Sequence, residues 1–183
     1  MLVVFSGPSG SGKNSVINGL LNKYPDIYAF MPSITTREMR PGESPGAPYH
    51  FVSEEEFLER LAAGEFYEHE RIHNVGLYGV SRKIHADMLG SGKILLKDVD
   101  VLGTVNLIEE LKEQKLLTIF LTAGSREELA RRLEVRGEPN IETRLYRYDK
   151  EMTFADNYDH IIVNDELDRA VEEAHETIIK YKI

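Results

Sequence analysis

A short glycine-rich segment near the start of the chain most constrains its fold. Residues 7–15 read Gly-Pro-Ser-Gly-Ser-Gly-Lys-Asn-Ser, between an apolar run at 2–5 and apolar residues at helical spacing. Glycine, four residues, then Gly-Lys between a strand and a helix is the P-loop pattern, in which backbone N–H groups converge on phosphate oxygens at a helix N-terminus. The pattern predicts a strand, loop and helix that bind nucleotide phosphates, with Lys13 as the mobile positive charge.

One residue departs from this pattern. The residue after the lysine is ordinarily Ser or Thr, whose hydroxyl ligates Mg²⁺, whereas here it is Asn14. An amide oxygen is a neutral hard donor, but its reach differs from that of a hydroxyl, and Mg²⁺ tolerates little distortion of its octahedron. Ser15 points about 100° further around the helix and is a poor substitute. We therefore expect an intact phosphate cradle with a weakened affinity for Mg²⁺.

Length and composition exclude several classes of protein. The 183 residues fit one domain. A net charge of −9 argues against a nucleic-acid or anionic-membrane surface. The absence of cysteine excludes disulfides and thiolate metal sites. With no export signal and no apolar stretch near the ~20 residues that cross a bilayer, we expect a cytoplasmic protein with small-molecule partners, either a monomer or a homo-oligomer.

Short apolar segments alternate with helical patterns along the chain. Strands are expected at 2–6, 93–99, 116–122 and 160–164, and helices at 15–23, 54–63, 82–89, 103–114, 126–135 and 166–181. This alternation implies right-handed crossovers and a largely parallel sheet with helices on both faces, so the fold class is α/β. Ligands of such sheets bind at the carboxyl ends of the strands.

Two segments do not resemble core elements. Residues 31–52 contain four prolines and two glycines, which suits a flap of loop or short antiparallel strands. Residues 125–158 are crowded with charge, and a solvated helical face is the ordinary structure of such a run.

Motifs outside the P-loop point to one family. They are Ser-Ile-Thr-Thr-Arg at 33–37, Arg-Pro-Gly-Glu at 40–43, Tyr-His-Phe-Val-Ser at 49–53, Gly-Glu-Phe-Tyr-Glu at 64–68, Tyr-Gly at 78–79, Asp-Val-Asp at 98–100, Arg-Leu-Glu-Val-Arg-Gly at 132–137, Arg-Leu at 144–145 and Val-Asn-Asp-Glu-Leu-Asp at 163–168. In this order and spacing, together with the P-loop, they resemble the guanylate kinases from end to end.

The resemblance implies a single domain over 1–183 with three parts. A P-loop NTPase-type core of parallel sheet between helices covers 1–32, 83–124 and 158–183, a GMP-binding flap covers 33–82, and a helical lid covers 125–157. It also implies the reaction ATP plus GMP to ADP plus GDP, with Mg²⁺ as cofactor.

Phosphoryl transfer spreads negative charge over the equatorial oxygens, which positioned cations stabilise. The resemblance assigns this catalytic role to Lys13, Arg37, Arg132 and Arg144. For ATP it implies binding by Ser9, Gly10, Ser11, Gly12, Lys13, Asn14, Ser15, Arg136 and Asn164. Asn14 and Asp98 are the residues expected to hold Mg²⁺, Asp98 through an ordered water.

The chemistry of GMP agrees with the matching residues. Guanine N1–H and the exocyclic amine are donors that need acceptors, for which the resemblance supplies Glu68 and Asp100. The acceptor O6 needs a donor, and Ser33 is the matching hydroxyl. The GMP site implied by the family comprises Ser33, Arg37, Arg40, Tyr49, Glu68, Tyr78, Asp98 and Asp100, with arginines and tyrosines on the phosphate.

Three further residues depart from the family pattern, among them Leu102, which replaces a polar residue common after the Asp-x-Asp pair. Val80 stands where a hydroxyl usually helps to bind guanine O6, so base selectivity is expected to be looser. Lys97 stands where an apolar residue is usual, and the sequence does not show whether it touches the site.

Three alternatives compete with a guanylate kinase. A catalytically silent binding module of the same fold is favoured by Asn14 and disfavoured by the retained Gly12 and Lys13. A sugar-phosphate kinase acting on ribose bisphosphate would not need Glu68 and Asp100. The segment 69–73 is a literal His-Glu-x-x-His zinc motif, but the residues after it would end the helix that zinc binding requires.

Overall fold

The computed structural model describes residues 1–72, 75–135, 137 and 140–182. Five strands form the main sheet in the order β10-β9-β1-β8-β2, and all neighbours run parallel. They are β1 (Leu2–Ser6), β2 (Tyr28–Phe30), β8 (Ile94–Asp98), β9 (Leu116–Thr122) and β10 (His160–Val163). The predicted parallel sheet is confirmed, although the short strand β2 was not predicted.

Helices cover both faces of this sheet, as α/β folds require. Alternate residues of β1 face opposite sides: Val3 and Phe5 pack with α1 (Lys13–Lys23) and α7 (Leu167–Lys182), whereas Leu2 and Val4 pack with α3 (Arg82–Leu89) and α4 (Val101–Glu110). All six predicted helices are found, two of them with the predicted bounds. The largest shifts are at α4, which ends four residues early at Glu110 and begins two residues early because the Asp100 side chain caps it.

Residues 33–81 form a second, mixed sheet in the order β4-β5-β3-β7-β6, joined by α2 (Glu54–Ala62). Its strands are β3 (Ser33–Thr35), β4 (Ser44–Pro45), β5 (Pro48–Phe51), β6 (Phe66–Ile72) and β7 (Gly76–Ser81). The expectation of antiparallel strands within 31–52 was wrong, because the loop after β3 returns the chain so that β5 runs parallel to β3.

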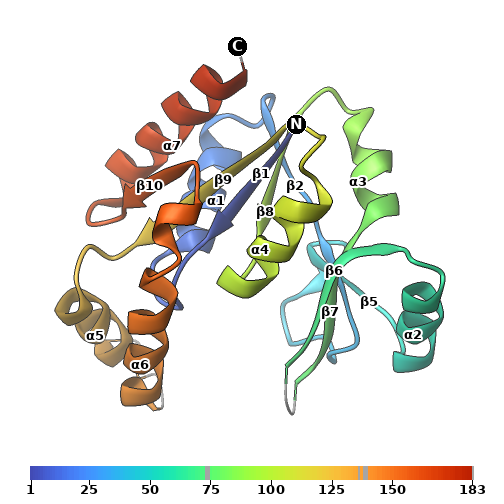
Figure 1. Ribbon diagram of the computed structural model, residues 1–183, viewed down its shortest axis with the longest axis horizontal. Coiled ribbons are helices and arrows are strands. Elements are labelled where there is room, and N and C mark those ends of the chain that lie inside the picture. Colours follow the sequence, from blue (N-terminus) through green and yellow to red (C-terminus); the bar gives the residue numbers. More distant parts are fainter. Residues whose placement is uncertain (73–74, 136, 138–139, 183) are drawn as a thin grey trace.

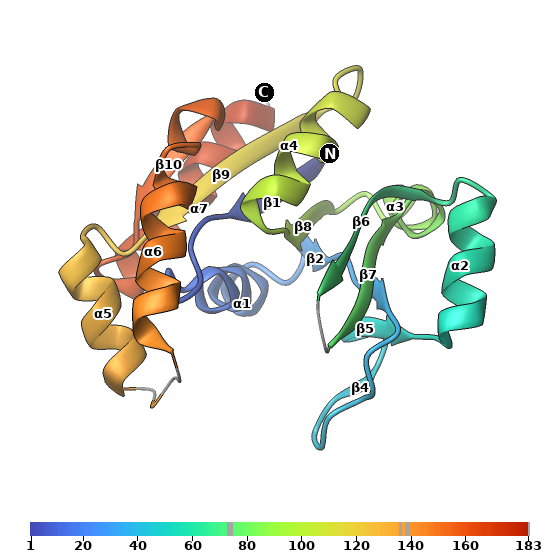
Figure 2. The ribbon, with the colours of Figure 1, turned by 60° about the horizontal axis from the view of Figure 1, so that its bottom comes forward.

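Two further helices, α5 (Arg126–Val135) and α6 (Ile141–Met152), pack through Leu129, Leu133 and Leu145. The sequence predicted the bounds of α5, whereas α6 falls within the expected helical lid but was given no bounds of its own. Figures 1 and 2 show this pair on one side of the molecule and the second sheet with α2 on the other. Among the described residues, no helix has both the length and the apolar character needed to cross a membrane.

Candidate functional site

The loop between β1 and α1 is shaped by glycines that no other residue can replace. Gly7, Gly10 and Gly12 have φ angles of 126°, 95° and 92°. A Cβ atom on Gly7 would lie 2.1 Å from the Leu121 carbonyl oxygen, and one on Gly12 would lie 2.2 Å from Nδ2 of Asn164. Glycine is therefore required at these positions for two reasons: the positive φ angles and the close approach of neighbouring atoms.

Lys13 begins α1 and curves back over this loop. Its ammonium donates to the carbonyl oxygens of Gly7 at 2.5 Å and Pro8 at 3.2 Å. Burial lowers the pKa of Lys13, while the nearby carboxylates of Asp98 and Glu151 oppose that shift. The loop thus holds a concentrated positive charge beside the α1 N-terminus, which is the arrangement that binds phosphate.

Three residues support the loop through hydrogen bonds: Asn164, which directly follows β10, Arg132 of α5 and Arg144 of α6. Asn164 is buried, and its Nδ2 donates to the Ser11 carbonyl oxygen at 2.8 Å. Arg132 donates through Nη2 to the Asn164 carbonyl oxygen at 2.7 Å and through Nε to Glu128 at 2.7 Å. Arg144 of α6 donates to Oγ of Ser9 at 2.6 Å. Arg132, Arg144 and Asn164, all predicted as site residues, therefore converge on the P-loop.

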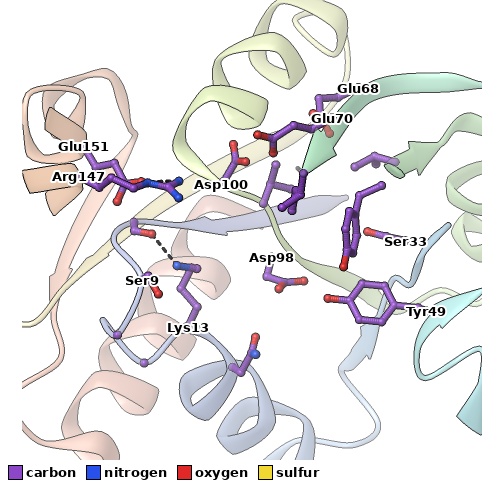
Figure 3. Close-up of a pocket in the computed structure, with 18 of the residues that line it drawn as sticks. Ser9, Lys13, Ser33, Tyr49, Glu68, Glu70, Asp98, Asp100, Arg147 and Glu151 are labelled. Atoms are coloured by element: carbon purple, nitrogen blue, oxygen red, sulfur yellow. Dashed lines mark hydrogen bonds and ion pairs between the residues drawn. The ribbon is translucent and has the colours of Figure 1, made fainter. Parts of the chain in front are cut away.

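A cavity of about 470 Å³ opens between the P-loop and the second sheet. This volume is in the usual range for small-molecule sites. Figure 3 shows Ser9 and Lys13 on one side, Ser33 and Tyr49 on the other, and Asp98 and Asp100 between them. The predicted residues that line the cavity are Ser9, Gly10, Gly12, Lys13, Asn14, Ser15, Ser33, Tyr49, Glu68, Tyr78, Asp98 and Asp100.

Other predicted residues do not form its wall. Ser11 is fully buried beneath the loop, Arg37 lies behind Tyr49, and the Arg40 side chain is exposed. Arg144 lines a smaller neighbouring cavity. Arg136 lies outside the described residues, so its predicted role stays a prediction.

Three carboxylates meet at the base of α4. One oxygen of Asp100 caps the helix by accepting from Gly103 N–H at 2.7 Å. Glu68 of β6 lies against the same helical turn, because a Cβ on Gly103 would be 3.1 Å from its Oε1. Glu70, two residues further along β6, shares a hydrogen bond with Asp100.

Crowding of these carboxylates changes their ionisation. Burial and the Asp100 charge raise the pKa of Glu68 to about 7, against an opposing effect of Lys97. The hydrogen bond to Asp100, followed by burial, raises the pKa of Glu70 to about 7, and Arg147 opposes that shift. Because ionised carboxylates here lack enough donors, a ligand that presents N–H groups would stabilise the charged form.

Arg37, two residues after β3, is paired with a carboxylate of the following loop. Its guanidinium donates to both oxygens of Glu43, at 2.9 and 2.8 Å, and lies 5.1 Å from the Tyr49 ring centroid. This pairing lowers the pKa of Glu43 to about 2. The rings of Tyr49 and Tyr78 lie edge to face at 5.7 Å. Two phenols in front of an oriented guanidinium form a corner suited to a phosphate.

The structure adds cavity residues that the sequence did not single out. Arg147 and Glu151 of α6 line the cavity, with Nη2 of Arg147 3.4 Å from Oε1 of Glu151. Arg147 could have been identified from the sequence, because it lies three residues after Arg144 and residues three apart share a helical face. Glu70 also lines the cavity, and its spacing of two from Glu68 on a strand could have identified it.

The His-Glu-x-x-His motif does not form a zinc site. His69 and Glu70 lie on β6, a strand, whereas the motif needs both histidines on one helical face. His73 lies outside the described residues. Within the described part of the chain, no group of three or more His, Asp or Glu side chains is placed to hold a metal ion.

Comparisons with known proteins agree on one family. The family model described as "Guanylate kinase" matches residues 1–181. The guanylate kinase of Salinibacter ruber is 41% identical over 94% of this chain and 92% of its own length. That of Chlorobaculum tepidum is 41% identical over 93% and 88%. The crystal structure of guanylate kinase from Anaplasma phagocytophilum matches with a TM-score of 0.74 and 29% identity, over 98% of this chain and 84% of that one.

Proposed function

This chain belongs to the guanylate kinase family, and from that premise we propose how its cavity divides between two nucleotides. The reaction is transfer of the γ-phosphoryl group of ATP to GMP, giving ADP and GDP. The observation that supports the proposed division is one cavity with the P-loop on one side and the carboxylates Glu68 and Asp100 on the other.

ATP binds on the P-loop side in this proposal. Backbone N–H groups of the loop and the start of α1 hold the phosphates, and Lys13 moves from its loop carbonyls to the β and γ phosphates. Arg132 and Arg144 stabilise the transferred group from α5 and α6, and residues 125–157 act as a lid. Arg147 of α6 also lines the cavity, beside Glu151, and acts with Arg132 and Arg144 in this role.

GMP binds on the side of the second sheet, with residues 33–82 as the flap. Glu68 and the uncapped oxygen of Asp100 accept hydrogen bonds from guanine N1–H and the exocyclic amine. Ser33 donates to O6. The GMP phosphate lies at the corner formed by Tyr49 and Tyr78, where Arg37 and then Arg40 reach it as the flap closes.

The reaction needs orientation and charge more than proton transfer. The attacking phosphate oxygen of GMP is already anionic, so in-line attack needs no general base. The cations from the loop, flap and lid neutralise the negative charge on the transferred group. Closure of flap and lid excludes water, which would otherwise accept the phosphoryl group from ATP.

The residues present fit a magnesium ion bound mainly through phosphates. Asn14 offers an amide oxygen, Asp98 a carboxylate at the end of β8, and both line the same cavity. Few protein ligands and several waters are typical of Mg²⁺ in kinases. When bound, the ion would neutralise negative charge on the phosphates held by the P-loop.

Restoring a hydroxyl at position 14 is expected to tighten binding of the metal. In calorimetric titrations with a non-hydrolysable ATP analogue, Asn14→Ser should lower the half-saturating Mg²⁺ concentration by about fivefold to tenfold, because a hydroxyl fits the octahedron better. GMP affinity should be independent of Mg²⁺ in both proteins. Asn18→Ser, on the same helix, is the matched control. An unchanged Mg²⁺ curve for Asn14→Ser, or Mg²⁺-dependent GMP binding, would refute this metal position.

The competing functions lose their support. The two curated relatives are guanylate kinases and match this chain over 92% and 88% of their own length. This disfavours a silent binding module and a sugar-phosphate kinase. We further propose that the partners are ATP and GMP themselves and that the protein works in the cytoplasm, which suits a chain without cysteine.

A further inference from the structure

A lysine is buried behind the base-binding end of the cavity. Lys97, on β8 and paired with Val4 of β1, is only 1% exposed. Its backbone lies in the middle of an apolar sheet, where Leu95 and Leu96 are also fully buried. A buried ammonium is costly unless specific partners compensate it, so its partners indicate its role.

Three groups surround the Lys97 ammonium. It donates a hydrogen bond to Oγ of Ser33, lies 3.7 Å from Oδ1 of Asp98, and lies 5.3 Å from the ring centroid of Phe30. Burial lowers the pKa of Lys97, and the charges of Asp98 and Glu68 oppose that shift. The contact geometry makes the amino group of Lys97 the donor and Oγ of Ser33 the acceptor, and the Asp98 carboxylate and the Phe30 ring are surroundings that suit a cation.

The bond to Lys97 decides what the Ser33 hydroxyl can do. A hydroxyl has one proton and two lone pairs. Because Ser33 accepts from Lys97, its proton is left for the cavity that it lines. The adjacent positive charge also polarises the O–H bond and makes it a stronger donor. The neighbouring Val80 lines the same cavity and has no donor on its side chain.

We propose that Lys97 is a positioning residue for base selection: it fixes the Ser33 hydroxyl as a donor and thereby selects purines with a 6-oxo group over those with a 6-amino group. The inference rests on the proposed placement of GMP. Guanine O6 accepts from this hydroxyl, whereas a 6-amino group would meet a second donor backed by a positive charge. Lys97 acts only through Ser33 and does not line the cavity.

The test compares two acceptors that share the ribose, the phosphate and the 2-amino group. They are GMP and 2,6-diaminopurine riboside 5′-monophosphate, and the measured quantity is the ratio of their kcat/KM values. We expect Lys97→Met to lower this ratio by about tenfold, because the freed hydroxyl can rotate and accept from the amine. Ser33→Ala should lower the ratio by a similar factor. Lys97 also lowers the pKa of Glu68, so any change in the carboxylate contacts at N1 appears as a difference between Ser33→Ala and the double variant.

A double-mutant cycle separates positioning from a general structural effect. If Lys97 acts through Ser33, the ratio in the double variant should equal that of Ser33→Ala. A structural role alone would lower kcat/KM for both acceptors equally and leave the ratio unchanged, which would overturn the inference. Lys97→Gln, which keeps a donor without the charge, provides a second variant if Lys97→Met does not fold, with an expected loss of about threefold to fivefold.

Failure of this inference differs from failure of the proposed GMP site. If wild-type protein prefers GMP and the Lys97 variants keep that preference, only the role of Lys97 is refuted. If Ser33→Ala itself leaves the ratio unchanged, the placement of guanine O6 is refuted, and the role of Lys97 with it.

Discussion

Lys13→Met is expected to lower kcat on the order of a thousandfold, the scale found when a transition-state charge partner is removed. The ammonium already lies at the mouth of the P-loop, 2.5 Å from the Gly7 carbonyl oxygen. Methionine keeps the length and apolar volume of the side chain but removes the positive charge that stabilises the transferred phosphoryl group. Steady-state rates with saturating ATP and GMP measure the effect.

The matched control for this variant lies on the same helix. Lys23 is exposed at the end of α1 and pairs with Glu172. Lys23→Met should keep kcat within about twofold, because screened surface pairs contribute little. GMP affinity, measured by calorimetry, should be the same in all three proteins. A Lys13→Met enzyme that retains more than about a tenth of wild-type kcat would contradict the role given to this lysine.

Glu68→Gln is expected to lower kcat/KM for GMP by about 100-fold at pH 8. Two effects add up to this loss. The charge-assisted hydrogen bonds of the carboxylate are removed, and the amide N–H₂ of glutamine is a donor that would oppose the guanine donors. Glu55→Gln, in the exposed first turn of α2, is the matched control and should keep wild-type kcat/KM. The effect should fall mainly on KM, because in the proposed site Glu68 binds the base and not the transferred group.

The same variant gives a pH signature. The pKa of Glu68 is raised to about 7, so the wild-type side chain becomes protonated as the pH falls below 7 and loses an acceptor. Protonated Glu68 then resembles glutamine, and the gap between the two proteins should narrow from pH 8 to pH 6. Ionisation of the GMP phosphate affects both alike and cancels in the comparison. A gap that is constant across this range would show that Glu68 is not the titrating acceptor.

The sequence was sufficient for four of the five strands of the main sheet and for the P-loop. Their signals are local: residues 2–5 are apolar in succession, as a strand buried on both faces requires. The glycines of the loop are fixed by backbone angles that other residues avoid. By contrast, β6 is largely exposed and carries charges, and β7 has two glycines among its six residues, so no long apolar run marked either strand. The ends of α6 were not predicted for a similar reason, because its segment is charged throughout and few apolar residues mark its limits.

The candidate site was predictable where a motif or a chemical requirement named the residue. Glu68 and Asp100 followed from the resemblance, and the structure places both on one cavity. Lys97 was not assignable, because neighbouring strand residues face opposite ways and only the packing of β3 against β8 brings Ser33 to its ammonium. Likewise, the pairing of Arg37 with Glu43 depends on how a loop folds back.

A crystal structure of the protein with GMP and a non-hydrolysable ATP analogue tests the central claim most directly. The account predicts that the guanine ring contacts Glu68, Asp100 and Ser33, while the GMP phosphate faces Lys13 across the cavity. A purine ring bound elsewhere, with Glu68 and Asp100 turned away from it, would contradict the account.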